Sequence, residues 1–355
     1  MPTVHKPLTI ALGTKLKSGP FGGGTKFAAA LTAYLTSQGH RVVTDLNQPN
    51  IDVILITEPR PWSSSGNFDT VNVLSYRHRY PATRIIHRIN ECDERKGNRL
   101  RLHNHLLYLT ARQADAVVFV SAWLKQLHYQ QNQNGWPKTT AVIHNGADST
   151  IFKRSTTIPW NGSSPLKIVT HHWSNNWNKG WDIYQRLDQL LAGPLGQKVL
   201  FTYLGTPRED VPLKNSRVLA PLTGRHLAVE LASHHLYITG SRYEPGPMHI
   251  AEALQVGLPI LYRASGSLPE YSSSYGVPLK TPADLLESLK KIMSNYPRYF
   301  TATQSYNYSA VQMCQSYENL LYQVLAQPQR PAPKTTDTIK VRAVQGALWL
   351  RNSLS

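Results

Sequence analysis

The sequence predicts an α/β protein with two doubly wound domains that face each other across a cleft. Three observations lead to this fold class. Strand-like and helix-like segments alternate through both halves of the chain, which is typical of parallel sheets with helices on both faces. A segment rich in Ser, Thr, Pro and Gly, residues 154–165, separates the halves like a linker. The length of 355 residues suits about two domains.

The first half predicts one sheet and its helices. Residues 26–38 have helical spacing, with Phe27, Leu31 and Leu35 on one face and Gly39 after them as a C-cap. Further helices are expected over 99–112 and directly after Ser121, whose hydroxyl suits an N-cap. Short apolar segments predict strands at 8–12, 41–43, 52–56, 83–87, 114–121 and 140–148.

The second half repeats this alternation and predicts a second sheet. Strands are expected at 166–172, 198–205, 235–241 and 258–264, and helices at 181–191, 227–232, 248–255, 284–294 and 311–325. The helix 248–255 is followed by Gly257 and Pro259, which suit a helix end. We therefore expect an N-terminal domain over 1–158, a C-terminal domain over 159–326 and a tail over 327–355. Ligands of such sheets bind at the carboxyl ends of the strands, so the cleft is the expected site.

The tail differs in composition from the two domains. Residues 327–338 are rich in Pro and Thr and are expected to be mobile. Residues 339–355 predict a basic amphipathic helix with Val341, Val344, Leu348 and Trp349 near one face. Such a helix can lie on an anionic membrane surface. The alternatives are a helix that packs on the body of the protein and a frayed end.

Basic residues clearly outnumber acidic ones. Lys and Arg number 38 and Asp and Glu 21, a formal net charge of +17. This excess favours a polyanionic partner, which can be nucleotide phosphates, an anionic membrane or a nucleic acid, over an inert basic surface. No apolar run is long enough for a transmembrane helix, and the first apolar segment is too short for a signal peptide. With only Cys92 and Cys314, a disulfide framework is excluded, and we expect a cytoplasmic protein.

The strongest functional signal lies in residues 241–261. A predicted strand leads into a loop with Glu244 and Gly246, and the helix that follows contains Glu252. A helix N-terminus offers backbone N–H groups to an anion or a hydroxyl. Each carboxylate can accept two hydrogen bonds from vicinal hydroxyls such as those of a sugar. The alternative, two glutamates of an ordinary surface, fits this strand–loop–helix context less well.

Glu244 and Glu252, within E-P-G-P-M-H-I-A-E-A-L, resemble the E-x7-E motif of retaining glycosyltransferases of family 4. That family has the GT-B fold of two Rossmann-like domains, and the resemblance covers about residues 8–325. It implies that Glu244 contacts the donor sugar and that Glu252 binds the nucleotide ribose. It also implies a sugar- and phosphate-lining backbone around Gly246, Pro247 and Met248, and a base-binding segment at Pro221 and Leu222.

A second block, residues 170–184, matches the family's phosphate-binding loop. Lys179, followed by Gly180, matches the lysine that grips the donor diphosphate, where charge builds up as the nucleotide leaves. The arginine that the family places upstream is absent, and His172 or Arg242 could replace it. Alternatives for the adjacent histidines are packing at a strand end or a metal site. No third ligand at zinc spacing accompanies them, so zinc is not expected.

Two N-terminal blocks complete the resemblance. The loop with Gly22, Gly23 and Gly24 resembles the family's glycine loop, which faces the donor phosphates and the acceptor; the alternative is a flexible turn. His87, at the end of a predicted strand, matches a histidine that touches the donor sugar near the reacting carbon; the alternative is a structural role. The loop after it holds the acceptor-side candidates Asn90, Glu91 and Asp93, of which Glu91 or Asp93 could serve as a general base.

The resemblance implies a retaining glycosyltransferase. It would move a hexose from a nucleoside diphosphate sugar, UDP- or GDP-linked, to a hydroxyl of a glycan, a lipid-linked sugar or another acceptor. The assigned roles are catalytic for Glu244, His87 and Lys179. No cofactor is expected, and the absence of D-x-D agrees with metal independence. Domain 1–158 would bind the acceptor and domain 159–326 the nucleotide sugar, with peripheral contact to the cytoplasmic face of a membrane through the tail.

Three other functions stay open at this point. One is a related nucleotide-sugar epimerase or sugar-phosphate synthase, and another a non-catalytic nucleotide-sugar-binding protein. The third is a nucleic-acid-directed protein on the same fold, which the net charge prompts but no recognisable nucleic-acid module supports. The sequence leaves open the base and sugar of the donor, the acceptor and the oligomeric state.

Overall fold

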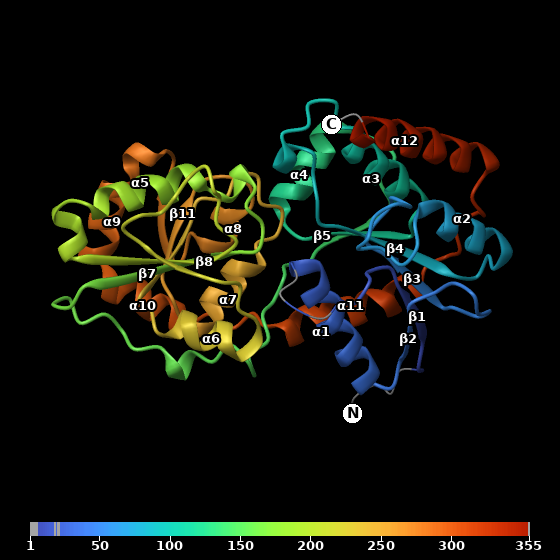
Figure 1. Cartoon of the computed structure of the whole chain (residues 1–355). Helices are drawn as coiled ribbons and strands as arrows, with labels where there is room; N and C mark the ends of the chain where they lie inside the picture. The colour runs from blue at the N-terminus through green and yellow to red at the C-terminus, as the bar shows by residue number, and fades with distance from the viewer. Residues whose placement is uncertain (1–5, 18, 20–21, 354–355) are drawn as a thin grey trace. The chain divides into compact units, whose positions relative to one another are not determined.

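The computed structural model describes residues 6–17, 19 and 22–353, and the chain within them forms two compact units (Figure 1). Each unit contains one parallel sheet with helices packed on it, which confirms the predicted α/β, doubly wound fold class. Residues 20–21 of the predicted glycine loop and 354–355 of the predicted tail helix lie outside the described residues. Unit 1 comprises Met1–Lys17, Gly24–His144 and Val311–Ser355, and unit 2 comprises Ser18–Gly23 and Asn145–Ala310.

The sheet of unit 1 has six parallel strands in the order β2-β1-β3-β4-β5-β6. Strands β3, β4 and β5 are buried along their whole length, as expected for a parallel sheet covered on both faces. The strands are β1 (Thr9–Leu12), β2 (Arg41–Val43), β3 (Val53–Ile56), β4 (Arg84–Ile89), β5 (Ala116–Phe119) and β6 (Thr139–Val142). All six predicted strands of the first half are present, most of them shorter than predicted.

Within the described residues, six α-helices are associated with this sheet. Ser121 caps α4 as predicted, because its hydroxyl accepts the backbone N–H of Leu124 at 3.1 Å. A helix that the sequence analysis missed, α2, begins with a capping box between Asp69 and Asn72. The helices are α1 (Gly23–Ser37), α2 (Thr70–Arg79), α3 (Leu102–Gln113), α4 (Ala122–Gln131), α11 (Ala310–Leu325) and α12 (Thr335–Ser353).

The sheet of unit 2 also has six parallel strands, in the order β12-β11-β10-β7-β8-β9. The strands are β7 (Leu166–His172), β8 (Val199–Gly205), β9 (Arg217–Leu219), β10 (Leu236–Thr239), β11 (Ile260–Arg263) and β12 (Gly276–Leu279). Strand β7 lies near the middle of the order, and the chain direction puts the carboxyl ends of β7, β10 and β11 at one edge. This is the edge where ligands of doubly wound sheets bind.

Helices of unit 2 pack on this sheet through two apolar clusters. They are α5 (Trp181–Leu191), α6 (Gly224–Ala232), α7 (Met248–Val256), α8 (Leu268–Ser272), α9 (Leu285–Ser294) and α10 (Tyr296–Gln304). Helix α7 ends at Gly257, whose φ of 90° is the left-handed conformation that suits a glycine C-cap. The start of α5 is fixed by Gly180, where an added Cβ would lie 2.3 Å from the backbone of Gly240.

The boundaries of the units differ from the predicted 158 and 326. The chain leaves unit 1 after His144, directly after the last strand of the first sheet, and α11 and α12 belong to unit 1 again. The segment 154–165 lies inside unit 2. Its polar residues bond to neighbours there: Arg154 donates to the carbonyls of Gln304 and Tyr306, and Thr157 to that of Val256. Its linker-like composition therefore reflects an irregular, hydrogen-bonded segment.

The apolar face of α12 packs on unit 1, as in the alternative of a helix that packs on the body of the protein, and contact with a membrane stays a prediction. Val341 and Leu348 are buried against Leu74 of α2 and Leu106 of α3. Trp349, expected on the same face, is 53% exposed. Residues 327–334 have no helix or strand, but the Arg330 side chain donates to the backbone carbonyls of Ala114 and Arg112. No helix in the described part of the chain is long and apolar enough to cross a membrane.

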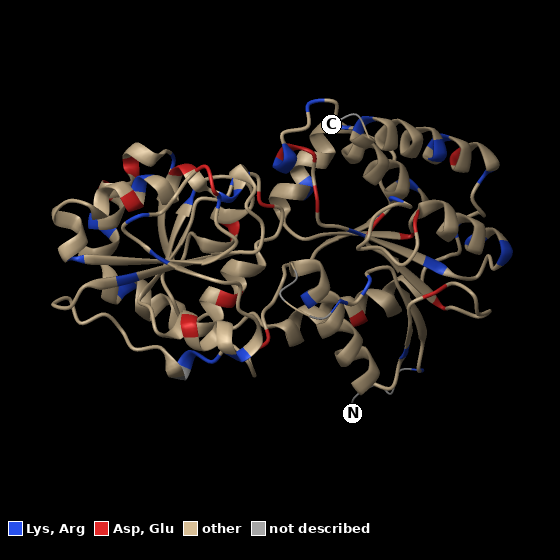
Figure 2. Cartoon of the chain, viewed as in Figure 1, with Lys and Arg blue, Asp and Glu red and all other residues tan. Residues whose placement is uncertain are grey.

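Basic side chains are spread over both units. Figure 2 shows Lys and Arg on helices and loops of both sheets, with Asp and Glu interspersed among them. The net charge of +17 is therefore a property of the whole chain, as its distribution in the sequence indicated.

Candidate functional site

The predicted donor residues of unit 2 gather at the carboxyl ends of β7, β10 and β11. His171 and His172 end β7, and Lys179 lies in the short helical turn Trp177–Lys179 that follows. Glu244 follows β10, and Glu252 lies on α7. The strand–loop–helix arrangement predicted around the two glutamates is thus present. In addition, each glutamate is paired with a basic side chain, Glu244 with Lys179 and Glu252 with His171, which the sequence did not indicate.

Lys179 and Glu244 form an ion pair, with 2.8 Å between Nζ and Oε2. The loop of Glu244 is held in place by the segment after β11. Both the backbone N–H and the hydroxyl of Ser267 donate to the carbonyl of Glu244, at 3.0 and 2.8 Å. Gly266 has a φ of 62°, and a Cβ there would lie 2.5 Å from the Glu244 nitrogen. The backbone at Glu244 is therefore held by close contacts that only glycine permits at position 266.

Glu252 is 1% exposed and pairs with His171, whose Nε2 lies 2.9 Å from Oε2. The other ring nitrogen, Nδ1, lies 3.1 Å from the hydroxyl of Tyr237. Glu252 comes just after the first turn of α7, whose first residue is Met248 and whose N-cap position is Pro247. The carbonyl of Gly246 accepts a hydrogen bond of 2.9 Å from the Asn145 side chain, which fixes the turn before the helix.

A second group of charges surrounds Asp182 at the start of α5. Arg263, the last residue of β11, donates to both of its oxygens at 2.7 and 2.6 Å, and Arg242 donates at 2.6 Å. Burial alone would raise the pKa of Asp182, but the hydrogen bonds and charges of the two arginines outweigh it and lower the pKa. The side chain of Arg242 is 36% exposed and that of Arg263 only 7%. Arg242 was predicted from the sequence as a phosphate ligand, whereas Arg263 and Asp182 were not predicted.

His172 cannot supply the missing positive charge in this arrangement. Its Nε2 lies 2.6 Å from the hydroxyl of Tyr184, and burial lowers its pKa well below the usual value. Burial also lowers the pKa of its neighbour His249 to about 3. Both imidazoles are therefore neutral near pH 7, and of the two candidates for a second phosphate cation the geometry favours Arg242.

The remaining predicted donor residues lie on separate elements. Gly22 directly precedes α1, and Gly23 and Gly24 are its first residues, so the glycines do lie at a helix N-terminus. Pro221 and Leu222 follow β9 and are half-buried, and Leu222 packs against the apolar cluster that includes α6 and α7. The contacts of these residues with a nucleotide remain predictions.

In unit 1, His87 is fully buried within β4, and neither ring nitrogen has a hydrogen-bond partner among the described residues. Burial lowers its pKa to about 3. Asp93 is likewise buried, and its oxygens accept the backbone N–H of Asn104 at 2.9 Å and the Asn98 amide at 3.0 Å. Asp93 thus fixes the loop between β4 and α3, and these hydrogen bonds argue against its use as a general base.

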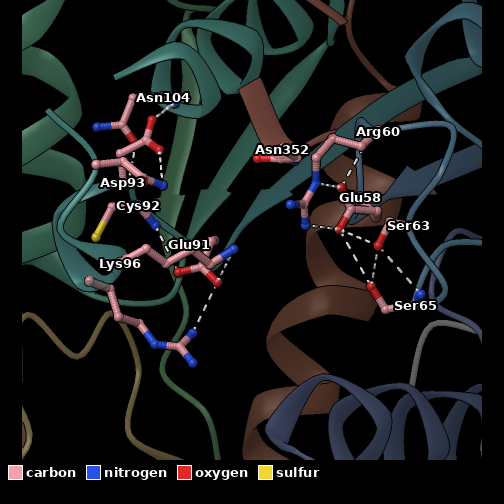
Figure 3. Close-up of polar contacts among 12 residues, drawn as sticks. Glu58, Arg60, Ser63, Ser65, Glu91, Cys92, Asp93, Lys96, Asn104 and Asn352 are labelled. Carbon is pink, nitrogen blue, oxygen red and sulfur yellow. Dashed lines mark hydrogen bonds and ion pairs between the residues drawn. The ribbon is translucent and has the colours of Figure 1, made fainter. Parts of the chain in front are cut away.

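Asn90 and Glu91, in contrast, line a cavity of about 150 Å³ in unit 1. Gly24 also lines it, as do Glu58, Arg60 and His103, which the sequence analysis missed. Figure 3 shows the polar contacts around this region, with the Glu58–Arg60 pair on one side and Glu91 on the other. The Arg60 Nε and Nη2 atoms each lie 2.7 Å from a different carboxylate oxygen of Glu58. Within the described residues, no group of three or more His, Cys, Asp or Glu side chains could hold a metal ion.

No known family model matches the sequence, and no curated protein does. Solved structures do match, at low sequence identity. Sucrose-phosphate synthase from Thermosynechococcus elongatus matches with a TM-score of 0.63 and 14% identity, over 90% of this chain and 99% of that chain. A glycosyltransferase from Rickettsia africae matches with a TM-score of 0.65 and 12% identity, over 91% and 100%. HepE from Anabaena, in complex with UDP-glucose, matches with a TM-score of 0.64 and 15% identity, over 89% and 99%.

These likenesses extend over nearly the whole of each chain. Together with the two six-stranded parallel sheets, they show that the chain has the GT-B fold of these glycosyltransferases. At 12 to 15% identity the likeness concerns the fold, and any function has to be argued from the site.

Proposed function

We propose that the chain is a retaining glycosyltransferase of the family 4 type, which moves a hexose from a UDP- or GDP-linked sugar to an acceptor hydroxyl. One observation carries the proposal: the Lys179–Glu244 and His171–Glu252 pairs lie together at the carboxyl edge of the unit 2 sheet, around the N-terminus of α7. This edge suits a nucleotide, and the two carboxylates suit the hydroxyls of its sugars. The fold is shared with HepE, whose structure holds UDP-glucose.

The residues of unit 2 divide the chemistry among them. The reaction breaks the bond between the anomeric carbon and the diphosphate. It forms a bond from that carbon, on the same face, to the acceptor oxygen, and the acceptor proton passes to the leaving diphosphate. Lys179, with Arg242 and the N-terminus of α7, would stabilise the charge that develops on the diphosphate without a metal ion. Glu244 would hold the donor sugar and Glu252 the ribose.

The proposed acceptor is a glycan or a lipid-linked sugar, bound on the side of unit 1. We place the protein in the cytoplasm. Contact with an anionic membrane would use the outer face of α12, where Ile339, Trp349 and Leu350 are exposed beside Lys340 and Arg342. A protein that binds nucleotide sugars without turnover is the second candidate function, because the family's upstream arginine is absent from the sequence and its replacement, Arg242, is paired with Asp182.

Calorimetric titration of the full chain with UDP-, GDP-, ADP- and TDP-sugars, without added metal, tests the donor site. We expect binding of one nucleotide class, weakened at least about tenfold by Glu252→Ala, a change of roughly 1.4 kcal/mol. Glu209→Ala, an exposed glutamate of the same unit, is the matched control and should not weaken it. Circular dichroism checks that both variants are folded.

Three outcomes separate the candidates. Transfer with an unchanged anomeric configuration, read by NMR of the product in EDTA, supports the proposal. Donor binding without transfer to any acceptor favours the binding protein. No binding across the panel contradicts both functions.

A further inference from the structure

The cavity in unit 1 lies between the loops that follow β3 and β4 and helix α3. Glu58 and Arg60 come from the loop after β3, Asn90 and Glu91 from the loop after β4, and His103 from α3. The volume of about 150 Å³ is the size of a cavity that holds a single six-membered ring. All the residues that line the cavity belong to unit 1; Gly24, one of the predicted donor glycines, is among them, but none of the donor residues of unit 2 is.

Its charges are paired with one another. Glu58 is bonded to Arg60 through two nitrogens, and Glu91 to Arg95 at 3.0 Å. Burial alone would raise the pKa of each carboxyl, but the neighbouring cations outweigh it and lower both pKa values. Both glutamates are therefore ionised near pH 7, and each negative charge has a guanidinium beside it.

This balance discriminates between ligands. A phosphate or carboxylate in the cavity would lie beside the ionised Glu58 and Glu91, and like-charge repulsion would weaken its binding because the neighbouring cations are already paired with the glutamates. An uncharged ligand with several hydroxyls meets no such cost. Its hydroxyls can donate to the carboxylate oxygens and accept from the guanidinium N–H groups, while the ion pairs stay in place.

His103 gives the second, independent observation. Its side chain lines the cavity, it is 3% exposed, and its Nε2 has no hydrogen-bond partner among the described residues. Buried polar atoms are nearly always hydrogen-bonded, so an atom like this in a polar cavity points to a ligand. Burial lowers the pKa of His103 to about 4, so the neutral ring offers one donor or one acceptor to a hydroxyl.

We propose that this cavity binds one uncharged, polyhydroxylated six-membered ring, a sugar or cyclitol unit of the acceptor, with His103 Nε2 bonded to one of its hydroxyls. The assignment of this ring to the acceptor rests on the proposed glycosyltransferase function. The ring can be a free molecule or the terminal unit of a larger glycoside, since both present the same hydroxyls.

Ligand-observed NMR on the full chain tests the binding without any turnover. The probes are myo-inositol, glucose, mannose and galactose, their methyl glycosides and their monophosphates. We expect at least one uncharged ring to bind, and its monophosphate to bind more weakly by about tenfold or more. Stronger binding of a methyl glycoside than of the free sugar identifies the terminal unit of a glycoside as the ligand. Stronger binding of the free sugar identifies a free molecule as the ligand.

His103→Ala should weaken binding of that ring about tenfold, and His103→Gln, which restores a donor and an acceptor, should recover part of it. The matched control is His105→Ala, an exposed histidine on the same helix. The donor affinity, measured by calorimetry, should be the same in all three variants. Preferred binding of the monophosphates, or unchanged binding in His103→Ala, overturns the inference. Ring binding that persists when no nucleotide sugar binds overturns the proposed function alone.

Discussion

Lys179 Nζ lies 2.8 Å from Glu244 Oε2, although the two residues come from loops after different strands, β7 and β10. The pair brings together a cation suited to a diphosphate and a carboxylate suited to the sugar attached to it. Its side chains are largely buried, so each limits the positions that the other can take.

Lys179→Ala should lower kcat of glycosyl transfer about 10²- to 10³-fold, the usual loss when one group that stabilises transition-state charge is removed. Lys179→Arg keeps the charge in a different geometry and should retain more of the rate. Lys167→Ala, an exposed lysine of β7, serves as the control. Steady-state kinetics with the donor identified by titration measures the effect. Turnover of Lys179→Ala close to that of the unaltered protein would rule out the phosphate role.

The His171–Glu252 pair predicts a loss of stability. Both side chains are buried, so His171→Ala leaves a carboxylate in a poorly hydrated place without its imidazole. Removing one partner of a buried hydrogen-bonded pair costs about 1–3 kcal/mol. We therefore expect the urea midpoint of unit 2 to fall, as followed by hydrogen exchange of α7. His226→Ala, an exposed histidine of α6, should leave the midpoint in place. An equal midpoint for both variants would show that the pair does not stabilise the folded unit.

Asp182 predicts a dependence of stability on pH. Its pKa in the folded chain is lowered by Arg263 and Arg242, which outweigh burial. A lowered folded-state pKa gives stability that is present above the ordinary value of 3.8 and is lost as the pH falls through the folded-state value. Asp182→Asn should lower the melting temperature at pH 7. The difference in melting temperature between the variant and the unaltered protein should become smaller below about pH 4. Scanning calorimetry from pH 3 to 7 measures it. A difference that does not change with pH would contradict the assignment.

From the position of Gln345 on α12, we predict that this helix stabilises the loop after β3, which lines the cavity of unit 1. Its side-chain amide donates to the carbonyl of Pro59 at 2.8 Å, between Glu58 and Arg60. Gln345→Leu leaves that carbonyl with only the longer hydrogen bond of 3.5 Å from the Thr70 backbone N–H, at a cost of about 0.5–1.5 kcal/mol. Amide hydrogen exchange of residues 58–66 should become faster, and donor affinity should not change.

Arg342→Ala, on the exposed face of the same helix, is the matched control for this change. Exchange in 58–66 that is unaltered in Gln345→Leu, or equally faster in both variants, would show that α12 only covers an apolar surface.

The fold could be predicted from the sequence because its signals are local. Residues 181–191 form a helix with the predicted bounds, since the apolar spacing and the flanking Gly180 agree. Helix α2 was missed because its polar sequence carries a weak apolar pattern, and its start depends on the capping box of Asp69. The segment 339–355 was ambiguous for a physical reason: an apolar helix face suits a lipid surface and a protein surface equally well.

The site was predicted in part. The motif around Glu244 and Glu252 has a fixed spacing that can be read along the chain. Asp182 and Arg263 are 81 positions apart, and their pairing depends on the order of strands in the sheet. His103 lies within the helix predicted over 99–112, where nothing in the sequence distinguishes it. That its Nε2 atom has no hydrogen-bond partner among the described residues depends on which residues surround it in the fold.

Unit 2 is inserted into the sequence of unit 1, and this affects how the protein is made. A ribosome synthesises Gly24–His144 first, then Asn145–Ala310, and only afterwards the segment that contains α11 and α12. Unit 2 can therefore complete its fold on the emerging chain while unit 1 still lacks α12, the helix that buries Val341 and Leu348 against α2 and α3. At a synthesis rate of roughly 5–20 residues per second, the apolar surface of α2 and α3 stays without α12 for on the order of ten seconds or more. The half of the protein that is translated first is the last to be finished, so chaperones that bind nascent chains would meet it in this interval.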